Sequence, residues 1–164
     1  MSADLKLPNV AAPHRTAMII VLALALGIVI YILIGVFVLI PRAADSGTAL
    51  SPMPFLIIAV LLAVGSIMLR RMQLNRARLQ AVVDARGIPG LVNHLVTTTI
   101  ICAALGESIG ALAIVVAALG GSEREVITLG LIGLLIVLRS YPSRLAWERI
   151  VDHYAMYAPD QVGK

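Results

Sequence analysis

The chain has 164 residues, of which 60% are hydrophobic and only 13% are charged. Soluble domains carry roughly a quarter of charged residues, so this composition excludes an ordinary soluble protein and favours an integral membrane protein. The net charge of +4 does not indicate nucleic-acid binding, because the arginines lie at the ends of apolar segments, where they act as topological signals. The single cysteine, Cys102, excludes a disulfide framework or a cysteine-based metal site within one chain.

Four apolar segments are long enough to cross a bilayer, which takes ~20 residues. They cover about 17–40, 50–69, 91–119 and 123–141. The fourth is the weakest, because only 126–138 is free of charge. Ser122 and Glu125 have capping-box spacing, which predicts a helix that starts at the membrane surface. At its other end we expect Arg139 to snorkel and Tyr141 to anchor the helix at the interface.

The distribution of basic residues predicts the orientation of these spans. The two short loops carry one basic residue each, Arg42 and Arg124. The other polar segments carry eleven: Lys6, Arg15, Arg70, Arg71, Arg76, Arg78, Arg86, Arg139, Arg144, Arg149 and Lys164. The positive-inside rule therefore places both termini and the middle loop in the cytoplasm. We expect one all-α, four-span domain over 1–164, located as a multi-pass protein in a bacterial inner membrane.

Two segments outside the spans are also predicted to be helical. In the middle loop, Leu79, Val82 and Val83 share one face, and the run ends at Gly87-Ile88-Pro89-Gly90. The C-terminal segment 143–157 carries an apolar stripe opposite a charged face. The stripe consists of Trp147, Ile150, Val151 and Tyr154. This amphipathic pattern is typical of a helix at the lipid headgroups, although a docking surface for a soluble partner would share it.

Small residues form a continuous face on the third span at spacings of three and four. These are Ala103, Gly106, Gly110, Ala113 and Ala117. The first span has a similar line at Ala23, Gly27, Tyr31 and Gly35, and the fourth has Gly130 and Gly133. Such faces let helices approach until their backbones touch. They either pack the monomer together or, on the third span, make a contact between subunits.

Glu107 interrupts the third span near its middle. An acidic side chain at the bilayer centre costs ~3 kcal/mol or more, so such residues usually face a partner, a cavity or an ion. Tyr31 falls about halfway along the first span and is the expected hydrogen-bond donor, with Ser108 and Tyr141 as weaker candidates. Glu107 would then either bind a proton or a cation reversibly, or form a polar contact that fixes the helix register.

The remaining polar signals are weaker. His94, near the start of the third span, could be solvated, hydrogen-bonded or an axial ligand to a haem or chlorin, but no paired histidine accompanies it. It is the one weak candidate for a metal ligand, and no other cofactor is indicated. The sequence contains no Ser/His/Asp set, HExxH motif, phosphate loop or carboxylate pair, so we expect no enzymatic activity.

The segment from Glu107 to Ala117, ESIGALAIVVA, resembles the ion-carrying helix of the proteolipid (c) subunit of rotary ATPases. Glu107 matches the family's membrane carboxylate, Ser108 a common neighbour, and Val115 to Ala117 the tail of the motif. The family's central aromatic residue and the glycine after it are Leu112 and Ala113 here. The resemblance covers about one helix of four and implies proton or sodium translocation through Glu107.

These observations lead to three expectations about function. The first is a structural or accessory subunit of a membrane complex or small oligomer, with lipids and other membrane subunits or copies of itself as partners. The second is proteolipid-like ion translocation through Glu107. The third is a cofactor-bearing membrane subunit with His94 as the ligand. No nucleic-acid partner is expected.

Overall fold

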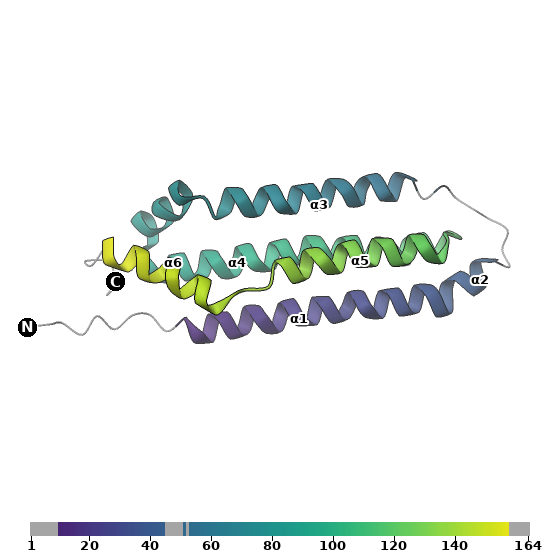
Figure 1. The fold of residues 1–164 in the computed structure, drawn as a ribbon, viewed down its shortest axis with the longest axis horizontal. Helices are drawn as coiled ribbons and strands as arrows, with labels where there is room; N and C mark the ends of the chain where they lie inside the picture. Colours follow the sequence, from purple (N-terminus) through teal and green to yellow (C-terminus); the bar gives the residue numbers. More distant parts are fainter. Residues whose placement is uncertain (1–9, 45–50, 52, 158–164) are drawn as a thin grey trace, which may run out of the picture.

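A computed structural model describes residues 10–44, 51 and 53–157, which form helices and no strands. Four long helices lie side by side along the long axis of the molecule (Figure 1). They are α1 (Ala11–Ile34), α3 (Met53–Gln73), α4 (Arg76–Ala118) and α5 (Glu123–Arg139). The central helix is α4, which contacts each of the other three, while α3 lies at the edge and packs mainly on α4. The all-helical architecture is therefore as the sequence predicts.

The first helix is longer than the predicted span 17–40. After α1 the chain continues through a π-helical turn, η1 (Gly35–Leu39), into α2 (Ile40–Ala44). The N–H of Ile40 donates to the carbonyl of Gly35, five residues earlier. Pro41 follows at once and has no N–H, and in a regular helix its ring would meet the carbonyl four residues earlier. The widened turn accommodates the proline, so the helix continues past the predicted span to Ala44.

The next two helices are α3 and α4, and α4 is bent at Gly87, where the sequence predicts a break. The second helix begins at Met53 and ends at Gln73, and its expected start at residue 50 lies outside the described residues, as do 1–9 and 158–164. Within α4, Gly87 has φ 65° and ψ −170°, so the helix breaks there into a short segment before it and a long one after it. That conformation is open almost only to glycine.

The capping box predicted before α5 is present. The backbone N–H of Ser122 donates to Glu125 Oε2 at 2.8 Å, and the N–H of Glu125 donates to Ser122 Oγ at 3.4 Å. These reciprocal bonds satisfy two backbone donors that the start of α5 would otherwise leave unpaired.

A short connection leads from the end of α5 to α6 (Arg144–Tyr157).

Three helical stretches of the described residues are long and apolar enough to cross a membrane: Ala11–Arg42, Met53–Gln73 and Arg76–Ala118. The 17-residue helix α5 meets the same test only together with α6, from which it is bent by 41°. Several apolar helices could thus cross a membrane, in agreement with a multi-pass membrane protein.

The apolar stripe of α6 packs on the chain itself, which corrects its expected contact with lipid or a partner. Trp147, Val151 and Tyr154 are 5%, 1% and 6% exposed. They belong to a core cluster, here called the end cap, with side chains from both parts of α4. The end cap consists of Val10, Ala17, Leu79, Val83, Ile88, Leu91, Val92, Leu95, Trp147, Val151, Tyr154 and Ala155. Because the bend at Gly87 brings the first part of α4 beside α6, the stripe is covered.

The start of α1 contacts α6 and the α5–α6 connection beside the end cap. The His14 ring lies edge-on to Trp147, with 5.6 Å between ring centroids. His14 Nε2 donates to the carbonyl of Pro142 at 3.0 Å. Trp147 is therefore not an interfacial anchor with an exposed ring, whereas Tyr141 is 41% exposed at the α5–α6 connection.

Candidate functional site

The hydroxyl of Tyr31 donates a hydrogen bond to Glu107 Oε1 at 2.9 Å. Tyr31 lies on α1 and Glu107 on α4, so this bond crosses between two of the long helices. Both side chains are only partly buried. The sequence predicted Tyr31 as the donor to Glu107 because both residues lie about halfway along their spans, and the structure shows this hydrogen bond. The role of the pair stays a prediction.

Small side chains flank this pair on both helices. On α1, Ala23 and Gly27 share the face of Tyr31, at intervals of four residues. On α4, Ala104 and Ala111 lie three residues before and four residues after Glu107, and both are partly exposed. A Cβ atom added at Gly27 would meet nothing within 4 Å. We call this partly exposed surface the polar seam (Ala23, Gly27, Tyr31, Ala104, Glu107 and Ala111).

The adjacent small-residue face of α4 is buried within the chain. A Cβ added at Gly106 would lie 3.0 Å from the carbonyl oxygen of Gly133 on α5. One added at Gly110 would lie 2.6 Å from Ile28 Cγ1 on α1. The face includes Ala103, Gly106, Gly110, Ala113 and Ala117, all buried. Of the two alternatives for this face, the structure shows packing within the monomer and not a contact with another subunit, because α5 and α1 already cover it.

The line of small residues on α1 divides into two parts. Gly35 is buried, and a Cβ there would lie 2.9 Å from Val126 Cγ1 and 3.4 Å from Ala117. A Cβ added at Gly27, one turn before Tyr31, would meet nothing within 4 Å. Gly35 thus serves packing as predicted, whereas the predicted packing role of Gly27 finds no neighbour within the described chain.

The two weaker candidates for Glu107 do not contact it. Ser108 is exposed, and its hydroxyl donates to the carbonyl of Ala104 at 2.9 Å. A serine hydroxyl that bonds back to the preceding turn has its donor occupied. The inclusion of Ser108 in the site is therefore corrected. Tyr141 lies at the α5–α6 connection, at the end of the molecule where the end cap is located.

His94 is partly buried, and its Nε2 is 3.1 Å from the carbonyl oxygen of Gln73 at the end of α3. A carbonyl only accepts hydrogen bonds, so Nε2 carries the proton and only Nδ1 remains for a ligand. Among the described residues, no group of three or more His, Cys, Asp or Glu side chains could hold a metal ion. His94 thus connects α3 to α4, and its use as a ligand stays a prediction.

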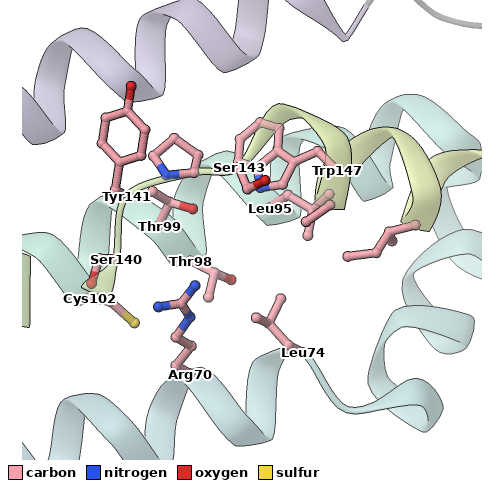
Figure 2. A pocket seen from close by; sticks show the side chains of 13 residues that line it. Arg70, Leu74, Leu95, Thr98, Thr99, Cys102, Ser140, Tyr141, Ser143 and Trp147 are labelled. Carbon is pink, nitrogen blue, oxygen red and sulfur yellow. The ribbon is translucent and has the colours of Figure 1, made fainter. Parts of the chain in front are cut away.

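Arg70, considered from the sequence only as a topological signal, lies in a site that the sequence analysis missed. A cavity of about 110 Å³ lies between α3, α4 and the α5–α6 connection, and Arg70 extends into it from α3 (Figure 2). Arg70 Nη1 donates to the carbonyl of Arg139. The backbone carbonyl of Arg139 therefore has a hydrogen-bond partner inside the protein. The interfacial position expected for the Arg139 side chain stays a prediction. The sequence feature that could have indicated this site is an arginine that lies as far along its helix as the hydroxyl-bearing residues Thr98 and Ser140 lie along theirs.

Comparisons with known proteins identify no relative. The chain matches no protein-family model, no curated protein and no solved structure.

Proposed function

We propose that this protein is a structural subunit of a membrane assembly, without enzymatic activity, that contacts another transmembrane helix at the polar seam. The observation that carries this proposal is the partly exposed pair of Tyr31 and Glu107 on two long apolar helices. The seam offers a polar contact in its middle and small side chains on either side. That combination is the usual chemistry of helix association in membranes.

The energetic argument starts from the position of the carboxyl group. A polar acidic side chain that remains in contact with lipid tails near mid-span costs free energy, on the order of several kcal/mol for the charged form. The Tyr31 hydroxyl satisfies one acceptor of Glu107 but leaves its second oxygen without a partner in the described chain. A further helix over the seam would exclude lipid and could donate to that oxygen.

The arrangement of spans that we infer contains α5 as the fourth membrane helix. Its 17 residues reach ~26 Å at 1.5 Å per residue, close to the ~30 Å hydrocarbon core. It lies along α4 for its whole length in Figure 1. Basic residues are more frequent in the two termini and the middle loop than in the two short loops, which favours a cytoplasmic position for the termini and the middle loop. We infer that the membrane is a bacterial inner membrane.

The first partner to test is a second copy of this chain, because most oligomers are symmetric assemblies of one chain. In a Cys102→Ala background, Gly27→Cys should form a disulfide-linked dimer when copper phenanthroline is added to membranes. Gly65→Cys on α3 is the matched control, since Gly65 is a helix glycine whose added Cβ also meets nothing within 4 Å.

The result separates the possible partners. A dimer from Gly27→Cys alone supports self-association through the seam. Equal dimer yields from both variants contradict the seam as the contact. If neither variant dimerises and the protein co-purifies in mild detergent with other membrane chains, a Gly27→Leu variant that loses them supports an accessory subunit. Retention of those chains by Gly27→Leu argues against the seam.

A second candidate function is proton or sodium translocation through Glu107. It is favoured by the partial exposure of the carboxyl group, which leaves it reachable from a neighbouring chain or from lipid, and by the resemblance to proteolipid subunits. This function predicts that a hydrophobic carbodiimide labels Glu107, and that Glu107→Gln abolishes ion flux in vesicles while assembly persists. The structural function predicts no flux in the unmodified protein.

A further inference from the structure

We propose that the cavity at Arg70 binds a phosphate-type oxyanion, supplied either by a phospholipid headgroup or by free phosphate. The cavity lies where α3 ends and α6 begins, far along the bundle from the α4–α5 turn (Figure 1). This site is separate from the polar seam, so its test does not depend on the proposed structural function.

The charge in the cavity is not compensated by the chain. Figure 2 shows Arg70 extending between Thr98 and Cys102 of α4. No acidic residue lines the cavity. The one ion pair among the described residues, Arg144 with Glu148, does not involve Arg70. One guanidinium nitrogen donates to the Arg139 carbonyl, which leaves further N–H groups in a planar fork that suits an oxyanion.

Hydroxyl groups line the cavity beside this cation. Thr98 lines the cavity and is only 5% exposed. A hydroxyl group can donate a hydrogen bond to an oxyanion, and hydrogen bonds to charged groups are stronger than those between neutral groups. Thr99 and Ser143 also line the cavity, and each carries a hydroxyl group. One cation and these three hydroxyl-bearing residues thus belong to the same wall.

The size and position of the cavity also suit this ligand. Its volume of about 110 Å³ has room for a group of a few heavy atoms, since one water takes up ~30 Å³ in the liquid. The first turn of α6 contributes Ala146 and Trp147 to the wall, and backbone N–H groups of a first helical turn favour anions. Leu74, Leu95 and Ile150 give the remaining wall an apolar character. The apolar run of α3 ends at Arg70. In the proposed arrangement of spans, Arg70 would therefore lie near the lipid headgroups.

The chain provides its own probe, because Trp147 is its only tryptophan and lines the cavity. The full-length protein in neutral detergent micelles is titrated with inorganic phosphate at constant ionic strength, and separately with phosphatidylglycerol. Diacylglycerol, which has acyl chains and no phosphate, is the lipid control. We expect a saturable change in Trp147 emission with at least one phosphate-bearing probe and none with diacylglycerol. A response to phosphatidylglycerol alone identifies a lipid site, and a response to inorganic phosphate identifies a site open to free anions.

Variants assign the response to the cavity. Arg70→Gln should weaken binding at least ~10-fold and Thr98→Val by ~5-fold, as expected for lost hydrogen bonds to a charged group. Arg71→Gln is the matched control, because Arg71 is the exposed neighbour that does not line the cavity. If Arg70→Gln fails to fold, Thr98→Val decides. No saturable response to either phosphate probe, an equal response to diacylglycerol, or unchanged affinity in the cavity variants that fold would overturn the proposal.

Discussion

Tyr31 and Glu107 are 76 residues apart in the sequence, yet the tyrosine hydroxyl lies 2.9 Å from a carboxyl oxygen. This bond joins α1 to α4 and lies on a partly exposed surface rather than in the packed interior. The buried small-residue face is next to it on α4, so one helix carries two faces with different roles. The glycines and alanines of the buried face pack against α1 and α5, and the polar seam is the surface that we propose contacts a partner.

The hydrogen bond between Tyr31 and Glu107 should make a modest contribution to stability. A double-mutant cycle with Tyr31→Phe and Glu107→Leu, measured by unfolding in mixed micelles, should give a coupling free energy of ~0.6–1.5 kcal/mol, the range typical of interhelical bonds in membranes. Ser108→Ala is the control, since its hydroxyl bonds only to Ala104 of its own helix. Zero coupling would show that the pair does not interact in the membrane.

The contact between Gly106 and Gly133 should tolerate no side chain. An added Cβ at Gly133 would lie 2.7 Å from the carbonyl oxygen of Gly106 and 2.8 Å from the Gly110 nitrogen, all backbone atoms that cannot rotate away. Gly133→Ala should therefore lower the free energy of unfolding by ~1–3 kcal/mol. Gly65→Ala, where an added Cβ meets nothing, should leave it unchanged or raise it. Equal effects would contradict the close approach of α4 and α5.

Gly87 sets the direction of the first part of α4. At φ 65° and ψ −170° an alanine is strained, at a cost of ~1–3 kcal/mol. Gly87→Ala should loosen the end cap, shift Trp147 emission to longer wavelength and speed hydrogen exchange at 76–86. Ala85→Gly, two residues earlier on an exposed position, is the comparison variant. An unchanged Trp147 spectrum in Gly87→Ala would mean that the bend is not required for the packing of the end cap.

The capping box at the start of α5 should contribute measurably to its formation. Ser122→Ala removes the side-chain acceptor for the Glu125 N–H and should cost ~1 kcal/mol. Ser122→Asp keeps an acceptor and should cost less. Hydrogen exchange at the first turn of α5 would report both effects. Equal exchange in Ser122→Ala and the unmodified chain would indicate that the cap does not stabilise the helix.

Part of the site could be read from the sequence because it depends on depth and periodicity along single helices. Glu107 and Tyr31 each lie near the middle of a span, and helices of similar length packed side by side bring equal depths together. Ser108 was misplaced in the site, because adjacent residues of a helix face about 100° apart. Whether the Ser108 hydroxyl reaches the Glu107 carboxyl group or bonds to the backbone of its own helix depends on this angle about the helix axis and not on proximity in sequence.

The amino-acid sequence by itself determined the helical architecture, the small-residue face, the bend at Gly87 and the capping box at Ser122, because these follow from composition and from interactions within a few residues. Only the tertiary structure decided which helix covers which face. It placed α5 and α1 over Gly106 and Gly110, the stripe of Trp147 in the end cap, and Arg70 in a cavity beside Thr98. Apolar periodicity shows that a face is suited to burial, but the partner that buries it is set by contacts between residues distant in the chain.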